Sequence, residues 1–480
     1  MYKTLSSFYQ NLLESKWKIF WTLLVASVLF RILSFNYSVI DHDESTYLLI
    51  ASELNEGARL YTDVVDTKPP GIFITFAIVE KVIGKSIFNI RLFGSFIISL
   101  SAFLLFLISR QFDINKSLAF LSGLCYIVIF SCYRTGLAVN TEMFFSLFAL
   151  AGLFILLKAE NKNVPGLWLL AGLLIGIGFI FKYVVLASFG AFTLFFLLEK
   201  KVFKNILRKI LKFTLGLLGV LLPFILTHLY FKLTGRFDDF YEIIYNVTSR
   251  YSSEFSIVNS IKFFLNFHLL YLPFLFLFYF GIFNKSLNSD VRKIAALWFA
   301  FAWIMVLLPG KPFRHYYLQL LPPISLIVPL AFSRLLTIKS IAATTKAKIA
   351  YGSIAIAFVI SVINQSYFWT QPDVVKEISA RIATNISEDD FIVTDKQLQL
   401  THYLLGLTPP SKYVHPTLIF SHNQAFAIDT EEEMNKILEK SPKFIIYEKS
   451  KNYYESNARV KSDYHLFDRI GKVTILQINP

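Results

Sequence analysis

The stretch DHDES, residues 41–45, places three carboxylates and a histidine shortly after an apolar segment that is long enough to cross a bilayer. The residues that follow predict a helix. Asp43 and Glu44 fall in its first turn, where the helix dipole stabilises negative charge. Two interpretations follow. The carboxylates either only cap the helix, or they supply a general base that deprotonates a hydroxyl group at the membrane surface.

Two later motifs carry cations that could bind an anion such as phosphate. Lys68 lies in DTKPPG, where the two prolines predict an extended chain that holds the ammonium near the lipid headgroups. Arg314 and His315 lie in GKPFRHYY, and a guanidinium binds phosphate oxygens in a bidentate manner. The alternative for Lys68 is an ordinary lysine whose long side chain reaches the headgroups. The alternative for GKPFRHYY is a belt of aromatic residues with such cations.

Further ionisable residues lie next to apolar segments. Arg134 and Glu142 belong to CYRTGLAVNTEMFF, and a carboxylate at the end of a membrane helix is costly unless it is paired or functional. The alternative is that Thr141 caps the next helix and Glu142 lies in its first turn. Lys182 interrupts a long apolar stretch, either at the tip of an outer turn or as a buried functional cation.

The composition indicates that membrane helices must position these residues. Of 480 residues, 55% are hydrophobic and 17% are charged, and the mean hydropathy is +0.54. Soluble domains are less apolar and carry more charge. The net charge of +14 does not indicate nucleic-acid binding, because Lys and Arg lie mainly between the apolar segments, where they set topology. Cys125 and Cys132 lie in one apolar segment, too far apart for a disulfide.

We predict a polytopic helical bundle with about eleven membrane spans. The predicted spans are residues 17–35, 88–109, 117–133, 142–158, 166–181, 183–198, 210–231, 261–283, 294–309, 317–334 and 349–367.

The positions of Lys and Arg predict the orientation. If the N-terminus is cytoplasmic, the basic loops, including the dense cluster at 199–212, all lie in the cytoplasm. This requires that the stretch 71–84, with Glu80 and Lys81, lies in the interface and does not cross the membrane. The acids and cations described above then share the outer face. Such a set fits a reaction on a lipid-linked phosphate, in which acids activate a nucleophile and cations stabilise a phosphate leaving group.

The C-terminal part differs from the rest in composition. Residues 368–480 alternate helix-like stretches, such as EEEMNKILEK, with strand-like ones, FIVTD, KFIIYEK and KVTILQI. This pattern predicts a small extracytoplasmic α/β domain. The expected organisation is a membrane domain of residues 1–367, whose first outer loop at 36–87 carries the acids, followed by this domain at 368–480.

The order DESTY, GARLYTD, KPPG and GKSIFNIRL resembles the first outer loop of bacterial relatives of protein O-mannosyltransferases and lipid A aminoarabinose transferases. These are integral-membrane class C glycosyltransferases. RHYYLQLLPP resembles a late turn of the same family, so that the resemblance covers about residues 17–335. It implies the class C fold, with interfacial helices beside the spans, and an inverting transfer of a sugar from a polyprenyl phosphate. The sugar and the acceptor stay open.

The resemblance also implies roles for individual residues. Asp43 is the expected general base with Glu44 beside it, and Glu142 matches the second acidic position, where relatives often have Asp. Lys68 and Arg314 match positions near the donor phosphate. The remaining predicted substrate-binding residues are Tyr47, Arg134, Lys182 and His315.

The expected partners are the polyprenyl-phosphate sugar, a lipid, glycan or protein acceptor and the membrane lipids, without nucleic acid. The expected location is the bacterial inner membrane, in glycosylation of lipopolysaccharide, protein or another envelope component. No cofactor is indicated, and a divalent metal is compatible with the acids without being indicated by them. The alternative is a flippase or transporter that binds the headgroup of the lipid-linked sugar with the same cations and catalyses no reaction. The sequence lacks the internal repeats that are typical of transporters.

Overall fold

The computed structural model describes residues 10–198, 206–251, 256–310, 313–338 and 343–480. Of the basic cluster expected at 199–212, residues 199–205 lie outside this range. The contacts divide the chain into two units, each assembled from three segments. Unit 1 comprises Met1–Leu33, Arg91–Leu229 and Ser253–Ser366, and unit 2 comprises Ser34–Ile90, Tyr230–Ser252 and Tyr367–Pro480.

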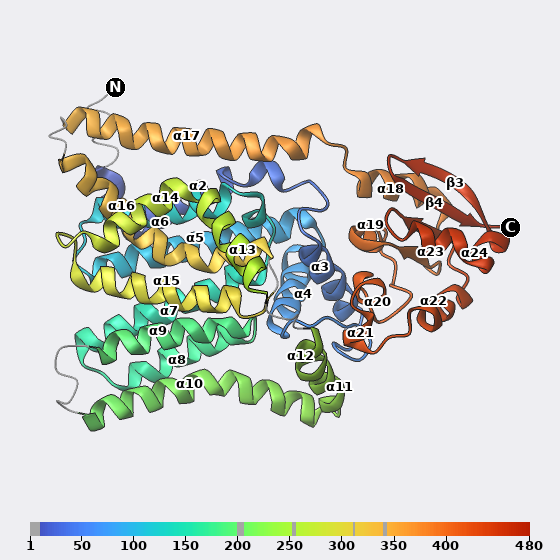
Figure 1. Cartoon of the computed structure of the whole chain (residues 1–480), viewed down its shortest axis with the longest axis horizontal. Coiled ribbons are helices and arrows are strands. Elements are labelled where there is room, and N and C mark those ends of the chain that lie inside the picture. Colours follow the sequence, from blue (N-terminus) through green and yellow to red (C-terminus); the bar gives the residue numbers. More distant parts are fainter. Residues whose placement is uncertain (1–9, 199–205, 252–255, 311–312, 339–342) are drawn as a thin grey trace. The chain divides into compact units, whose positions relative to one another are not determined.

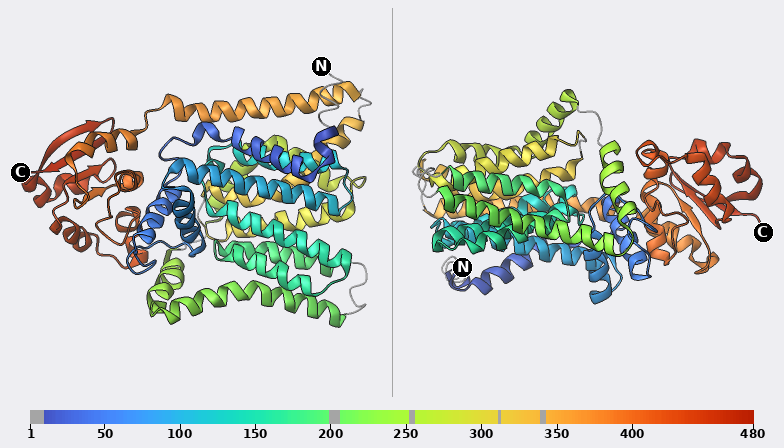
Figure 2. Two further views of the ribbon diagram at one scale, coloured as in Figure 1. Left: turned by 180° about the vertical axis from the view of Figure 1, so that it is seen from behind. Right: turned by 90° about the horizontal axis from the view of Figure 1, so that it is seen from below.

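Unit 1 consists of helices, most of which lie side by side (Figures 1 and 2). They are α2 (Lys16–Leu29), α5 (Ile87–Gln111), α6 (Lys116–Ser131), α7 (Thr141–Lys162), α8 (Gly166–Phe179), α9 (Leu186–Leu197), α10 (Ile206–Leu233), α13 (Ile257–Leu270), α14 (Leu272–Phe283), α15 (Ser289–Leu307), α16 (Leu321–Ile338) and α17 (Ala343–Thr370). The ends of α5, α10 and α17 extend into unit 2. Three short helices, η2 (Arg134–Gly136), η3 (Tyr183–Val185) and η5 (Arg314–Leu320), connect long ones.

Small residues allow α8 and α10 to approach closely. A Cβ at Gly172 would lie 2.0 Å from the carbonyl oxygen of Gly216, and one at Gly219 would lie 2.2 Å from that of Leu169. Both distances are far too short for a real contact, so that only glycine fits at these positions. Close backbone approach through small residues is typical of helix packing within membranes.

Within the described ranges, four helices are long and apolar enough to cross a membrane: α5, α7, α10 and the helix Arg314–Thr337. There are five if α13 and α14, which bend by 93° at their junction, form one span. The expected count of about eleven spans is therefore not confirmed, although a helix lies on each predicted segment. A 14-residue helix such as α8 is about 21 Å long, which is shorter than the ~30 Å hydrocarbon core.

Unit 2 contains the first loop and the C-terminal part. Its helices are α3 (His42–Asn55), α4 (Gly71–Ile83), α11 (Phe237–Tyr241), the π-helix η4 (Glu242–Val247), α12 (Thr248–Tyr251), α18 (Val374–Ile382), α19 (Leu400–Leu405), α20 (Thr417–Phe420), α21 (Asn423–Phe426), α22 (Thr430–Glu439), α23 (Lys451–Ser456) and α24 (Ala458–Asp463). The helix α4 packs on α3 and is not among the helices that could cross a membrane. Its position in the interface stays a prediction.

A four-stranded sheet lies near the C-terminus, and three of its strands fall on the predicted strand-like stretches. Its strands are β1 (Ile392–Thr394), β2 (Phe444–Tyr447), β3 (Tyr464–Ile470) and β4 (Val473–Ile478), in the order β1-β2-β4-β3. The pair β1–β2 is parallel and the other pairs are antiparallel. The helix α22 packs its buried Met434, Ile437 and Leu438 into the core beneath the sheet.

Hydrogen bonds join the first loop to the C-terminal part inside unit 2. The backbone N–H of Val65 donates to the carbonyl of Lys412 at 2.9 Å. The amide of Gln399 donates to the hydroxyl of Thr46 at 3.1 Å. The segment that bears DHDES is thus held by residues more than 340 positions away in sequence.

Candidate active site

The DHDES stretch forms the start of α3, and the capping residue is Asp41. Its carboxylate accepts a hydrogen bond from the backbone N–H of Asp43 at 2.9 Å, and its backbone is extended, as at other N-caps. Asp43 and Glu44 follow in the first turn, as expected, and are buried, at 9% and 1% exposed. Asp41 therefore accepts the capping hydrogen bond of α3. Asp43 and Glu44 are buried residues of its first turn.

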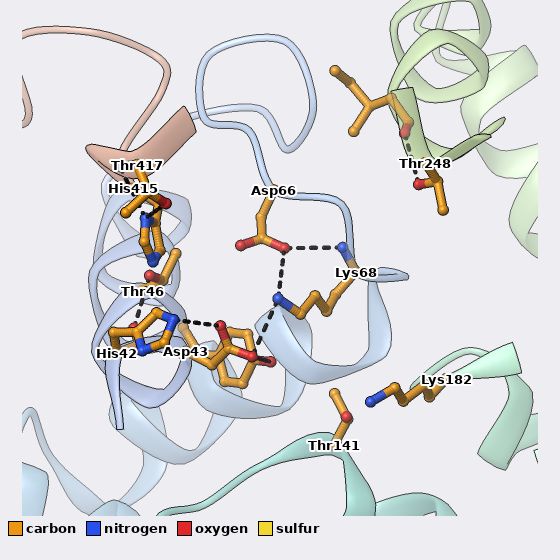
Figure 3. A network of polar contacts seen from close by, with 12 residues as sticks. His42, Asp43, Thr46, Asp66, Lys68, Thr141, Lys182, Thr248, His415 and Thr417 are labelled. Atoms are coloured by element: carbon orange, nitrogen blue, oxygen red, sulfur yellow. Dashed lines mark hydrogen bonds and ion pairs between the residues drawn. The ribbon is translucent and has the colours of Figure 1, made fainter. Parts of the chain in front are cut away.

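Asp43 forms an ion pair with Lys68, and Asp66 approaches the same ammonium (Figure 3). Lys68 Nζ lies 3.3 Å from Asp43 Oδ2 and 3.6 Å from Asp66 Oδ1. The hydroxyl of Tyr47 lies 3.5 Å from Asp43 Oδ2, and Lys68 Nζ is 5.8 Å from the centre of the Tyr47 ring. A carboxylate, an ammonium and an aromatic ring thus share one small region.

The loop before α4 fixes the position of Lys68. Its backbone N–H donates to Asp66 Oδ1 at 2.9 Å, and its carbonyl accepts from the hydroxyl of Tyr61 at 2.8 Å. Burial raises the pKa of the Asp66 carboxyl, the neighbouring Asp43 raises it further, and Lys68 opposes the shift. The sequence interpretation missed Asp66. The available signal was the D-x-K spacing, in which an Asp side chain accepts from the backbone two residues on.

His42 lies beside the other oxygen of the Asp43 carboxylate, and His415 lies beside His42. His42 Nε2 lies 3.9 Å from Asp43 Oδ1, and the rings of His42 and His415 are 5.1 Å apart. The backbone N–H of Thr417 donates to His415 Nδ1 at 3.2 Å, and the Thr417 hydroxyl lies 2.6 Å from the same nitrogen. Burial lowers the pKa of His415 to about 3, so that its ring is neutral. Nothing in the sequence pattern distinguished His415.

These residues have the chemistry of a metal site. One ligand atom each from His42, Asp43 and His415 lies within 4.8 Å of the other two. Imidazole and carboxylate are ligands of zinc and related ions. Around a tetrahedral zinc ion, ligand atoms lie about 3.3 Å apart, so that a pair at the 4.8 Å limit would have to approach by about 1.5 Å. The donor set therefore fits a divalent metal, but the observed spacing is wider than a bound ion requires.

A second polar cluster lies in unit 1. Lys182 Nζ lies 2.5 Å from Glu142 Oε1, and the hydroxyl of Thr141 donates to Glu142 Oε2 at 3.2 Å. The Lys182 ammonium is also 4.0 Å from the centre of the Tyr316 ring, and His315 precedes that residue in η5. Lys182 lies at the turn between α8 and η3, and its ammonium contacts a buried acid.

The loop that leads to Glu142 is held by a buried arginine. Arg31 is 0% exposed and donates to the carbonyls of Gly136 and Leu137, at 2.8 Å for Leu137, and to the hydroxyl of Ser95. The sequence interpretation did not single it out, although an arginine inside an apolar segment is itself a signal. Arg134 and Arg314 are exposed. Residues 311 and 312 of the GKPFRHYY motif lie outside the described ranges.

The predicted site residues therefore form two clusters, one in each unit. Asp43, Lys68 and Tyr47 belong to unit 2, while Glu142, Lys182 and His315 belong to unit 1.

A protein family matches the middle of the chain by sequence. Residues 67–231 match the family described as dolichyl-phosphate-mannose-protein mannosyltransferase. This range includes Lys68, Glu142 and Lys182 and begins after Asp43. None of the curated proteins matches the chain.

Solved structures match nearly the whole chain in fold. ArnT from Cupriavidus metallidurans, bound to undecaprenyl phosphate, is similar with a TM-score of 0.67 and 12% identity, over 94% of this chain and 96% of that one. The archaeal oligosaccharyltransferase AglB from Archaeoglobus fulgidus, in complex with an inhibitory peptide and a dolichol-phosphate, is similar with a TM-score of 0.53 and 12% identity, over 96% and 74%. The Archaeoglobus fulgidus oligosaccharyltransferase in complex with Zn and sulfate has a TM-score of 0.51 and 12% identity, over 91% and 69%. The expected resemblance to class C glycosyltransferases is thus confirmed at the level of the fold.

Proposed function

We propose that the chain is a membrane glycosyltransferase that moves a sugar from a polyprenyl-phosphate donor to a lipid, glycan or protein acceptor. The observation that carries this proposal is the contact of the Asp43 carboxylate, in the first turn of α3, with the Lys68 ammonium, in the loop before α4, at 3.3 Å. It puts a proton acceptor beside a cation that can bind phosphate. The family match over 67–231 and the fold shared with ArnT bound to undecaprenyl phosphate support it.

In the proposed reaction, an acceptor hydroxyl attacks C1 of the sugar. Asp43 takes the hydroxyl proton as the new bond to C1 forms. The bond from C1 to the phosphate oxygen breaks on the opposite face, and the polyprenyl phosphate leaves with the electron pair. Attack opposite the leaving group inverts the anomeric centre. Because a phosphate carries the developing charge readily, no acid has to protonate it.

The ammonium of Lys68 can bind a donor that carries negative charge, and its acidic neighbours hold it in place until the donor arrives. Without donor, the ammonium is shared between Asp43 and Asp66. A phosphate at Lys68 would draw the ammonium from Asp43, which leaves that carboxylate more basic. Asp66, which also accepts from the Lys68 backbone, keeps the lysine in place.

The other predicted residues complete the proposal. Glu142 and Lys182 form a second polar surface for substrate, and Arg314 adds a cation for the leaving phosphate. Glu44 supports Asp43 from the same turn. Tyr47, Arg134 and His315 contact substrate. A divalent metal, if the reaction needs one, would be held by His42, Asp43 and His415.

The proposed location is the bacterial inner membrane, with a cytoplasmic N-terminus. The first loop and residues 368–480 then face the outside, where the C-terminal part helps to hold the acceptor. The basic loops between the apolar segments support this orientation.

The experiment that tests the function uses the full-length chain in lipid vesicles. The donors are radiolabelled polyprenyl phosphates that carry a hexose, an N-acetylhexosamine, a pentose or an aminopentose, and an envelope extract supplies acceptors. We expect label on an acceptor together with an equal amount of released polyprenyl phosphate from at least one donor. If every donor is recovered chemically intact but moves between the leaflets, the chain is a transporter and the proposal fails.

A further inference from the structure

Asn140 is buried at the N-cap of α7, but its side chain does not cap the helix. It holds the N-cap position of α7 with an extended backbone, φ −105° and ψ 166°, but its side chain makes no capping hydrogen bond. An asparagine at an N-cap ordinarily accepts from the backbone of the first helical turn. The side chain is 1% exposed, and in the part of the chain that the structure describes neither its amide nitrogen nor its amide oxygen has a hydrogen-bond partner.

An amide that is buried without partners destabilises the fold. Most buried polar groups are paired, and each exception calls for a physical explanation. Alanine would occupy this position without leaving a polar atom unpaired. The amide is therefore suited to a partner that comes from outside the chain.

The neighbouring residues indicate what kind of partner this is. Thr141 and Glu142 follow directly, and the Glu142 carboxylate is neutralised by Lys182 (Figure 3 shows the Lys182 ammonium pointing towards Thr141). The ring of Tyr316 lies 4.0 Å from the same ammonium. An amide with a donor and an acceptor, a charge-balanced acid and an aromatic ring favour a neutral ligand rich in hydroxyl groups over a bare anion.

We propose that Asn140 determines sugar specificity by binding two neighbouring hydroxyl groups of the transferred sugar. Its amide nitrogen donates to one hydroxyl oxygen, and its amide oxygen accepts from the other hydroxyl. This inference rests on the proposed function and adds to it a residue that determines which sugar is bound. A site that hydrogen-bonds a substrate hydroxyl discriminates strongly against an analogue that lacks it, because the protein group is then left unpaired.

The test compares Asn140→Ala and Asn140→Asp with a matched control, Thr193→Val. Thr193 lies in α9 of the same unit, is 6% exposed, and its hydroxyl also has no partner within the described ranges. The probes are the polyprenyl-phosphate sugar that the wild-type chain transfers and its monodeoxy analogues, with the full-length chain in vesicles. Both Asn140 variants should raise the donor KM by about tenfold or more and lower kcat less. The unfolding temperature of Asn140→Ala should stay the same or rise, because no hydrogen bond is lost, whereas the buried carboxylate of Asn140→Asp should lower it. Thr193→Val should leave the donor KM and kcat unchanged.

The deoxy donors separate recognition from structure. The penalty of Asn140→Ala should vanish with the analogue that lacks the hydroxyl bound by Asn140, and persist with the others. An equal penalty with every analogue, or a donor KM within about twofold of wild type for both variants, overturns the inference while the enzyme remains active. If the wild-type chain transfers none of the donors, the proposed function itself fails and the inference falls with it.

Discussion

Removing one partner of the Glu142–Lys182 ion pair should destabilise unit 1 more than removing both. The two atoms are 2.5 Å apart, the Glu142 side chain is 0% exposed, and that of Lys182 is 17% exposed. Breaking a buried pair leaves an uncompensated charge and costs about 3–5 kcal/mol. Replacing both partners by neutral groups of similar size is often neutral or stabilising.

The two single variants should differ because the two partners are not equally buried. Lys182→Met leaves a fully buried carboxylate with the Thr141 hydroxyl as a hydrogen-bond donor, so that we expect the full loss of about 3–5 kcal/mol. Glu142→Gln leaves an ammonium that can reach solvent and still faces the Tyr316 ring, so that we expect about 1–3 kcal/mol. The double variant should lie within about 1 kcal/mol of wild type.

The assay is thermal unfolding of the four purified chains in one detergent, followed by intrinsic fluorescence. Lys182→Met should unfold at the lowest temperature, Glu142→Gln next, and the double variant near wild type. The pair Lys212–Glu160, at 2.7 Å with side chains 12% and 21% exposed, serves as a control that should show weaker coupling. If the losses at Glu142 and Lys182 simply add, the two side chains do not interact in the folded chain and the reasoning is refuted.

Three further outcomes are expected. Gly136→Ala should unfold at a much lower temperature than wild type, because its Cβ would lie 1.7 Å from the carbonyl oxygen of Phe130; an unchanged unfolding temperature would show that this turn is built differently. Burial raises the pKa of Glu53 from 4.5 to about 7, so that the folded chain keeps a proton that the unfolded chain loses, and stability should fall as the pH rises from about 5 to 8. Glu53→Gln should flatten that slope in unfolding temperature, and an equally steep slope in the variant would assign it to other groups. The proposed orientation can be tested with single cysteines at the exposed positions of Glu56 and Lys162, in a chain without its native cysteines. An impermeant thiol reagent applied to intact cells should label the cysteine at position 56 but not the one at 162. Equal labelling would contradict the proposed orientation.

The local features of the site could be predicted from sequence, whereas contacts between distant segments could not. The helix start at DHDES and the acid at the start of α7 each follow from a few neighbouring residues. The extended chain expected at KPP is not observed, because Thr67 and Lys68 form a bend and Pro70 has helical angles, φ −68° and ψ −19°. His415 and His42 are in contact although they lie more than 370 residues apart in the sequence, and no local pattern predicts such a contact. Asp66 was missed although its signal is local: its side chain accepts from the backbone N–H of Lys68 and also lies near the Lys68 ammonium.

The strand pattern was incomplete for a similar physical reason. β1, β2 and β4 carry buried apolar residues and were predicted, whereas β3 is buried only at its two end residues and shifts its register between Leu466 and Asp468. An edge strand of this kind lacks the alternation on which the prediction depends.

The division of the chain at residue 367 stays a prediction about independent folding. Unit 2 also contains Ser34–Ile90 and Tyr230–Ser252, and the first loop donates a backbone hydrogen bond to Lys412. Composition separates the C-terminal part from the membrane helices, but it carries no information on which loops pack against that part.

The measurement that tests the central claim most directly is the turnover of Asp43→Asn with saturating radiolabelled donor, at matched protein level. Asn keeps the size and polarity of Asp43 but cannot take the proton, and general-base catalysis contributes about a hundred- to ten-thousand-fold. Turnover should fall by at least about a hundredfold with little change in donor KM, whereas Lys68→Ala should mainly raise donor KM. If Asp43→Asn keeps most of the wild-type turnover, Asp43 is not the base, and the acids of DHDES serve only to start the helix.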